Sequence, residues 1–464
     1  MSVTWLPWGD AAFARARETG RPLLLSLSAG WCGACHRMDE ETWDDPGVAA
    51  VVETTTVPIR IDADERPDLY GRYHLGGLPS TALLSPEGEF LRGGTFLSPT
   101  QLLGLLDAAR ADLREGRRPS PRARAIAAPT APLVTEMVAR LRRRADREHG
   151  GFGAGAKLPE PEAVTLLLRE WQRTGDAELA AIARESLDAI AAHLVDPADG
   201  GFFRYAAAAD WSGPHTEKVT VDQAALIALF LEASATLGSA EYRRVALRGL
   251  EHARARLADA EGRAYASIAA APRDEVDRRR FADAGAALVR AGLLARELAG
   301  VDAGLTLEAP GAAPDGVAPH WLDAPAGVAT PRGLLRDQAL TIAAAVETHR
   351  VRVDGALLDW AGRAAAWSLA NLWDESRGAF RDAGSMSSLF PQGSGQGEGG
   401  FFPLVANGEM AQALLSLSDA SGDARWRRLA AAVVQSLAPE AARSPAGAAL
   451  ALAAQRLDRG TTTT

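Results

Sequence analysis

The sequence predicts two domains of different class: an α/β domain at the N-terminus, followed by an all-α domain built as a closed toroid of six helical hairpins, (α/α)6. Three observations support this prediction. The 464 residues are enough for two or three domains. Residues 1–116 alternate short apolar strands with amphipathic segments, which is typical of an α/β sheet. From residue 133 onward, long Ala- and Leu-rich helices alternate with Gly-rich loops.

The elements of the first domain follow from periodicity. Continuous or alternating apolar runs predict strands, and apolar residues three or four positions apart predict helices. Pro46 and Pro99 stand where helices can start, and Gly20 stands where one can end. The predicted strands cover 21–29, 54–62 and two segments within 76–94; the predicted helices cover 9–19, 35–43, 45–53, 65–75 and 98–115.

A segment rich in Pro, Arg and Ala, 117–132, lacks periodicity and is predicted to be a linker. The toroid is expected over 133–458, and a disordered tail over 459–464.

Two recurrent patterns predict the toroid. A loop signature places Asp six residues before Phe or Tyr, with Gly between them, and it begins at Asp146, Asp196, Asp259 and Asp374. A second signature starts helices at 221, 282, 336 and 407, a spacing that leaves room for two helices and a loop. Such units must stack or close on one another to bury their apolar faces. An open solenoid is the alternative, because the loop signature degenerates between 300 and 330.

Composition excludes several classes of function. The net charge of −9 argues against nucleic acid or an anionic membrane surface as a partner. We find no run of about 18 apolar residues, so no membrane span is predicted. The stretch "MSVTWLPWGD" lacks the basic and apolar regions of a signal peptide, so a cytoplasmic location is expected.

The two cysteines, Cys32 and Cys35, lie in "GWCGACHRM". This spacing suits c-type haem attachment, half of a zinc site, or a redox dithiol. Zinc needs two further ligands, and the chain has no second Cys pair and no His pair of suitable spacing. Haem is normally attached outside the cytoplasm. The predicted strand before the pair and helix after it favour the dithiol, so no metal and no cofactor are predicted.

The helical start after Cys32 predicts the roles of the two sulfurs. Helix N-terminal N–H groups stabilise a thiolate, so Cys32 is expected to be the more exposed nucleophile. Cys35, expected to be more buried, would resolve a mixed disulfide.

Residues 1–116 resemble the thioredoxin-like domain of the family that includes spermatogenesis-associated protein 20 and bacterial relatives, known by the uncharacterised domain DUF255. The resemblance rests on Trp5 and Trp8, "WCGACHRMDEETWDDPGVA", "IDADERPDLYGRYH" and "GGLPSTALLSPEGEFLRGGTF". It implies that Pro79 is a cis-proline that faces the dithiol and positions a partner chain. Ser26 stands where thioredoxins place a buried acid, and Ala34 where they carry Pro.

Segments 149–171 and 199–233 resemble the C-terminal part of the same family, whose fold is similar to six-hairpin glycosidases and N-acylglucosamine 2-epimerases. The resemblance implies a sugar as a possible ligand of the toroid. One departure is the family's "SWNG" element, which here reads "ADAG" (282–285) and has lost Trp and Asn.

The toroid's candidate pocket is predicted from titratable residues near helix starts. Lys157 and Lys218 are the only lysines in a chain that otherwise uses Arg, which indicates sites that need a compact ammonium. We expect both to face the toroid cavity and to approach Glu217, Asp222 or a neighbouring helix start. Paired carboxylates there could act as acid and base on a sugar. The candidates are Lys157, His215, Glu217, Lys218, Asp222, Asp283, Asp337 and Glu409. For Asp283 and Asp337, capping of helix N-termini is the favoured interpretation.

The leading functional prediction is thiol–disulfide exchange, with Cys32 as nucleophile, Cys35 as resolving thiol and Pro79 positioning the partner. The alternatives are a carbohydrate-active or carbohydrate-binding toroid with an accessory thioredoxin-like domain, and a scaffold in which both domains only bind protein. The expected partner is therefore a protein thiol or disulfide, or a small molecule such as a sugar, with no nucleic acid and no membrane.

Overall fold

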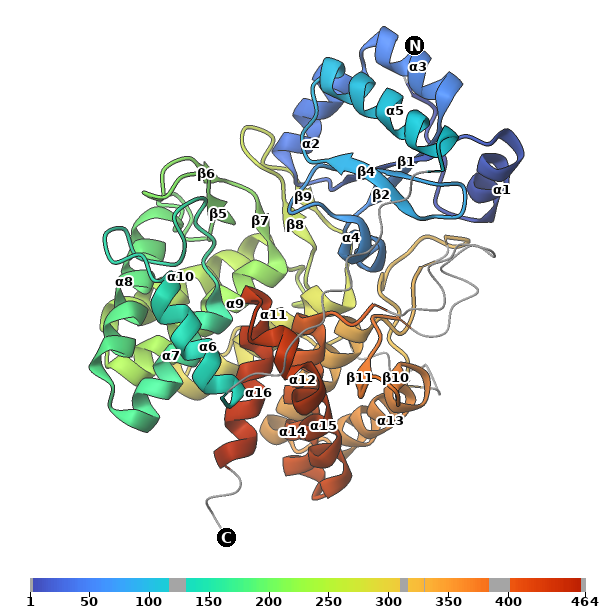
Figure 1. Ribbon diagram of the computed structural model, residues 1–464. Helices are drawn as coiled ribbons and strands as arrows, with labels where there is room; N and C mark the ends of the chain where they lie inside the picture. The colour runs from blue at the N-terminus through green and yellow to red at the C-terminus, as the bar shows by residue number, and fades with distance from the viewer. Residues whose placement is uncertain (1–2, 117–130, 309–315, 329, 384–400, 460–464) are drawn as a thin grey trace. The chain divides into compact units, whose positions relative to one another are not determined.

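The computed structural model describes residues 3–116, 131–308, 316–328, 330–383 and 401–459 (Figure 1). They form two compact units. The first contains the described residues up to Gly116 together with Ala383 and Phe401, and the second contains the other described residues from Ala131 onward. Most of the predicted linker (117–130) and tail (460–464) lies outside the described residues, so both stay predictions.

The first unit is built on a four-stranded sheet with strand order β2-β1-β3-β4. β1 runs parallel to β2 and antiparallel to β3, and β4 is antiparallel to β3. The predicted α/β class is confirmed. The strands are β1 (Leu23–Ser28), β2 (Val57–Asp62), β3 (Ser80–Leu84) and β4 (Phe90–Gly94); the helices are α1 (Asp10–Thr19), α2 (Gly33–Met38), a π-helical turn (Asp39–Trp43), α3 (Pro46–Thr55), α4 (Pro67–Tyr73) and α5 (Pro99–Arg114).

β1 is buried on both faces, which explains why it reads as a continuous apolar run. Leu23, Leu25 and Leu27 pack on one face with Phe13 of α1 and with α4. Leu24 points to the other face and packs with α2, α3 and α5. Because successive side chains of a strand point to opposite faces, helices cover the sheet on both sides.

The described helices of the second unit, α6 to α16, form two layers. The inner helices pack in a ring, each against the next, and α16 packs against α7 to close it. The closed toroid is therefore confirmed over the open solenoid. In ring order the inner helices are α7 (Pro161–Thr174), α9 (Thr220–Leu237), α11 (Ala282–Ala299), α12 (Leu335–Arg352), α14 (Leu404–Ser421) and α16 (Ala448–Arg459); the outer ones are α6 (Leu133–Arg144), α8 (Ala177–His193), α10 (Ala240–Arg256), α13 (Gly355–Asn371) and α15 (Ala424–Ala441).

One outer helix of the toroid is missing among the described residues. Every inner helix except α12 follows an outer helix in the chain, whereas the described residues between α11 and α12 contain no helix. Pro319, Pro325 and Pro331 recur through this stretch. Each proline fixes φ and removes an N–H donor, which prevents a regular helix. The degeneration of the loop signature at 300–330 therefore coincides with a hairpin whose described residues include no outer helix.

The loop signature forms tight turns between outer and inner helices. The backbone oxygens of Asp146, Asp196 and Asp374 accept hydrogen bonds from the N–H of a glycine four residues later, at 2.9, 2.8 and 2.7 Å. These glycines have φ values of 76°, 81° and 62°, a left-handed conformation that favours Gly. Short strands flank the loops: β5 (Tyr205–Ala206), β6 (Pro214–His215), β7 (Lys218–Val219), β8 (Ser267–Ile268), β9 (Val276–Asp277), β10 (Trp373–Asp374) and β11 (Ala379–Phe380).

Among the described helices, α9 is long and apolar enough to cross a bilayer by length and composition, with a mean hydropathy of 1.3 over 18 residues. Half of that window is buried in the protein. The helix belongs to the inner ring and packs against α7, α10 and α11. Its apolar character is therefore explained by packing within the toroid.

Candidate functional site

Three segments of the first unit meet at one edge of its sheet. β1 ends at Ser28, which pairs with Asp62 at the end of the parallel strand β2. Leu27 of β1 pairs with Ser80, the first residue of the antiparallel strand β3. The residues that follow β1 and β2 and those that precede β3 therefore share this edge. They are the cysteine pair, the "DERPD" element (64–68) and the loop that contains Pro79.

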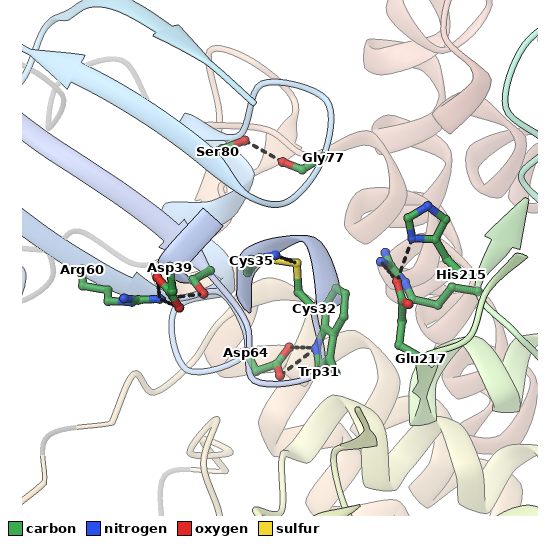
Figure 2. Close-up of a disulfide and its surroundings, with 12 residues drawn as sticks. Trp31, Cys32, Cys35, Asp39, Arg60, Asp64, Gly77, Ser80, His215 and Glu217 are labelled. Atoms are coloured by element: carbon green, nitrogen blue, oxygen red, sulfur yellow. Dashed lines mark hydrogen bonds and ion pairs between the residues drawn. A yellow bond between two sulfur atoms is a disulfide. The ribbon is translucent and has the colours of Figure 1, made fainter. Parts of the chain in front are cut away.

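Cys32 and Cys35 form a disulfide at the start of α2, with their Cα atoms 5.2 Å apart (Figure 2). Cys32 is the N-cap residue, and its Sγ accepts a hydrogen bond from the Cys35 N–H at 3.1 Å. The expected difference in exposure is absent, because the two residues are 3% and 2% exposed. The asymmetry between the sulfurs lies in this hydrogen bond, which would favour a thiolate at Cys32 over one at Cys35.

The "DERPD" element holds the tryptophan that precedes the disulfide. Both carboxylate oxygens of Asp64 accept from the Trp31 indole N–H, at 3.1 and 3.0 Å (Figure 2). The Asp64 N–H in turn donates to Asp62 at 2.8 Å. Arg66 donates to both oxygens of the buried Asp68, at 3.0 and 2.7 Å. Sequence reasoning noted this element as a family feature but did not find its contact with Trp31.

The loop before β3 is held by its own serine. The Leu78–Pro79 peptide bond is cis, as the resemblance implies. The Ser80 hydroxyl donates to the Gly77 carbonyl at 2.6 Å (Figure 2). It also accepts from the Leu75 N–H at 3.0 Å. The role of Pro79 in positioning a partner chain stays a prediction.

In the toroid, Lys157 is fully buried, but its partner is not the one expected. Its ammonium donates to Asp146 at 2.6 Å and to a backbone carbonyl at 2.8 Å. Asp146 begins the first loop signature. The ammonium holds the pKa of Asp146 well below its ordinary value. The expected approach of Lys157 to Glu217 or Asp222 is therefore wrong, because the carboxylate of its own loop satisfies it.

Lys218 repeats this contact one hairpin later. Its ammonium donates to Asp196 at 2.7 Å and to both oxygens of Asp199 at 2.8 Å. The expectation that it approaches Glu217 or Asp222 is therefore also wrong. The two remaining signatures use arginines: Asp259 pairs with Arg263 and Asp374 with Arg381. The scarce lysines thus stabilise loops, and nothing in these contacts places them in a ligand pocket.

The structure does bring together His215, Glu217 and Asp222. The two acids are linked by an arginine that was not a candidate from the sequence. Arg204 lies 3.4 Å from Glu217 and 3.2 Å from Asp222. The His215 Nδ1 lies 3.7 Å from Glu217 (Figure 2), and its ring stacks on Tyr205 at 4.0 Å. Burial alone would raise the pKa of Glu217, but His215 and Arg204 outweigh it and leave the pKa below its ordinary value.

Two further candidates converge on Arg336 of α12. Its guanidinium lies 3.6 Å from Asp283 of α11 and 3.3 Å from Glu409 of α14. A third acid, Glu162 of α7, was not a candidate from the sequence. Burial raises the pKa of Glu162, and the like charges of Glu409 and Asp222 raise it further. α7 lies across the ring from α12. Glu162, Asp222 and Asp283 lie in the first turns of their helices and Glu409 lies near the start of α14, so these acids gather around the N-terminal end of the inner ring.

Asp337 lies close to Asp283 of the Arg336 group, but its hydrogen-bond partner is a histidine. The His320 Nδ1 lies 3.0 and 3.1 Å from the two carboxylate oxygens of Asp337, and both residues are buried. The capping interpretation is wrong for both Asp283 and Asp337. They lie within the first turns, the N-caps are Phe281 and Leu334, and neither helix has a side-chain cap. No local pattern marks His320, a lone histidine in a Pro-rich stretch.

Comparison with known proteins confirms the resemblance inferred from the sequence. Residues 1–111 match the family model described as a protein of unknown function, DUF255, a DsbH-type thioredoxin family. Human spermatogenesis-associated protein 20 is 28% identical over 309 residues, which cover 57% of this chain and 38% of that protein. The thiol:disulfide interchange protein DsbD 1 of Pseudomonas aeruginosa is 34% identical over 104 residues, 22% of this chain and 16% of that protein.

The second unit is similar to a solved sugar-enzyme fold. The structure of cellobiose 2-epimerase from Spirochaeta thermophila aligns with a TM-score of 0.56 and 14% identity, covering 71% of this chain and 97% of that one. This likeness supports the toroid fold alone. The present chain spans 38% of the length of the human relative, so an activity of that whole protein does not transfer to it.

Proposed function

We propose that this protein carries out thiol–disulfide exchange at Cys32 and Cys35. The observation that carries the proposal is the Cys32–Cys35 disulfide at the start of α2, with the Cys35 N–H directed at the Cys32 sulfur at 3.1 Å. The cis-proline loop at the same sheet edge and the similarity to DsbD 1 support it. A location in the cytoplasm stays a prediction.

The exchange needs no group beyond the two cysteines and a partner. In the reduced protein, the Cys32 thiolate attacks one sulfur of a partner disulfide and expels the other as a thiolate. Cys35 then loses its proton and attacks the Cys32 sulfur, which restores the Cys32–Cys35 disulfide and releases the second partner thiolate. The partner gains two electrons and the dithiol loses two.

Insulin reduction by dithiothreitol tests this proposal. Wild-type protein should accelerate the reduction, and Cys32→Ser should abolish the effect. Cys35→Ser should trap a mixed disulfide between Cys32 and insulin, which non-reducing gels and mass spectrometry would detect. If the wild-type rate equals that of dithiothreitol alone and Cys35→Ser forms no adduct, the proposal fails.

As a second candidate we propose that the N-terminal end of the inner ring binds a sugar. The observation in its favour is the gathering of Glu162, Asp222, Asp283 and Glu409 around Arg336, with one of these acids, Glu162, carrying a raised pKa. Acids with unequal pKa values can divide the roles of acid and base.

Calorimetric titration with cellobiose and with mannose is the test of this second candidate. Binding of either sugar should weaken by about tenfold or more in Glu409→Gln, because a charge-assisted hydrogen bond is lost. Absence of heat for both sugars at millimolar concentration would remove this candidate and leave the dithiol proposal untouched.

A further inference from the structure

We propose that Asp283, His320 and Asp337 form a binding site for a divalent transition-metal ion, an inference beyond thiol exchange. The three side chains come from α11, from the segment that replaces the missing outer helix, and from α12. One ligand atom of each lies within 4.8 Å of the other two. Metal–ligand bonds of about 2.1 Å join ligands up to about 4.2 Å apart, so side-chain shifts of well under about 1 Å complete the site.

The histidine is already held in place by the surrounding backbone. The His320 N–H donates to the Pro331 carbonyl at 2.8 Å, and its carbonyl accepts from the Ala282 N–H at 2.9 Å. The Phe281 ring stacks on the imidazole with centroids 4.9 Å apart. Asp337 then meets the imidazole Nδ1 with both oxygens. A metal ion bound by both groups would take the place of the proton between them, which is released or moves to Nε2, and it would find these two ligands already beside each other.

Charge balance favours a cation beside Asp337. Asp222 pairs with Arg204, whereas Asp283 and Glu409 share Arg336. Asp337 is only 1% exposed, and its ion-pair partner among the described residues is His320, which carries a charge only when protonated. Beside a neutral imidazole this buried carboxylate has no charged partner at close range, which is costly, and a divalent ion shared with Asp283 would lower that cost.

A buried amide next to Asp337 in α12 independently indicates that water or another polar ligand binds at this helical turn. Gln338 is fully buried, and neither its amide nitrogen nor its oxygen has a hydrogen-bond partner among the described residues. Gln223 and Asn407, at the same position of α9 and α14, each bond the N–H and the C=O of a loop phenylalanine. Buried amides of this kind usually hold ordered water, and an ion with three protein ligands keeps water in its remaining positions.

The donor set selects the class of metal. One imidazole with two carboxylates suits zinc or manganese, whereas magnesium and calcium prefer oxygen donors alone. The site does not involve the cysteines, so its occupancy is expected to be independent of the redox state of Cys32 and Cys35.

Calorimetric titration of the full, disulfide-oxidised chain with zinc, manganese and magnesium chlorides tests the site. We expect one zinc or manganese ion per chain, with magnesium at least about 100-fold weaker. His320→Gln and Asp337→Asn should each weaken binding by about 100-fold or more. Glu178→Gln, which removes a first-turn acid of the outer helix α8, is the matched control and should leave the affinity within about threefold.

Circular dichroism establishes that each variant is folded. If the two buried variants do not fold, Asp283→Asn replaces them, because Asp283 is the most exposed of the three residues. An anomalous difference map from zinc-soaked crystals should show one peak between the three side chains. No binding at millimolar metal, unchanged affinity in the variants, or a zinc peak elsewhere would each overturn the proposal.

Discussion

Replacing Lys218 by Met should destabilise the toroid by about 3 kcal/mol. The ammonium lies 2.7 Å from Asp196 and 2.8 Å from Asp199, and its side chain is 5% exposed. Removing one partner of a buried ion pair costs about 3–5 kcal/mol, because the other charge stays buried without compensation. The aspartates are 19% and 28% exposed, so water takes over part of the lost interaction and the lower end of that range applies.

Urea denaturation followed by far-UV circular dichroism at pH 7 would measure this loss. Arg244→Met is the matched control, since Arg244 forms an exposed pair with Glu241 on α10 and its loss should cost less than about 0.5 kcal/mol. Burial alone would raise the pKa of Asp199, but the Lys218 ammonium outweighs it and lowers the pKa. The difference between wild type and Lys218→Met should therefore be complete above about pH 4 and shrink as the pH falls below that value.

Two results would refute this reasoning. One is a decrease in the free energy of unfolding in Lys218→Met that is no larger than the decrease in Arg244→Met. It would mean that the ammonium does not stabilise the loop aspartates. The other is a stability difference from wild type that does not shrink between about pH 4 and pH 2, where the aspartates of the unfolded chain take up protons.

Three further predictions concern other contacts. Asp64→Ala should destabilise the first unit by about 1.5–3 kcal/mol in urea, because the Trp31 indole N–H loses a charged acceptor; Asp64→Asn should lose less. In metal-free protein, Gln338→Met should leave the free energy of unfolding unchanged or raise it by up to about 2 kcal/mol, whereas Gln223→Met should lower it by about 2 kcal/mol. Urea denaturation measures both changes, and an equal loss of stability in the two variants would reveal a partner for the Gln338 amide. Burial lowers the pKa of His252 to about 4, so the unfolded chain binds more protons between pH 4 and about 6.5. The free energy of unfolding should therefore rise by about 3 kcal/mol across that window, and replacing His252 with Gln should flatten the rise.

The sequence by itself determined the class and order of the domains. The apolar run of β1 and the alternation of strands and helices around it indicated an α/β domain, and the recurrent Asp-to-aromatic loops indicated hairpins in a ring. These signals are local, because each depends on periodicity or turn chemistry within about ten residues. The cysteine pair was identified for the same reason, since its chemistry depends on a spacing of three residues and on the helix that follows.

Most of the toroid's charge pairing was decided by the tertiary structure. The sequence indicated that Lys157 and Lys218 each need a compact site, but their partners were assigned to the wrong carboxylates. Both Lys157 and the expected Asp222 lie near helix starts, and a sequence pattern cannot tell which acid the folded loop brings within 3 Å. The aspartates of the loop signature are nearest, and a buried ammonium must pair with whatever carboxylate is close enough to replace its water.

His320 and Glu162 show the same limit. His320 lies in the Pro-rich segment that connects α11 to α12, and it reaches Asp337 only through the folded course of that segment. Glu162 comes under the influence of Glu409 because the ring closes through α16, which packs against both α14 and α7. Local sequence specifies how each helix forms, whereas the charge environment at the end of the ring depends on side chains that are far apart in the chain, because electrostatic interactions act through distance in the folded protein.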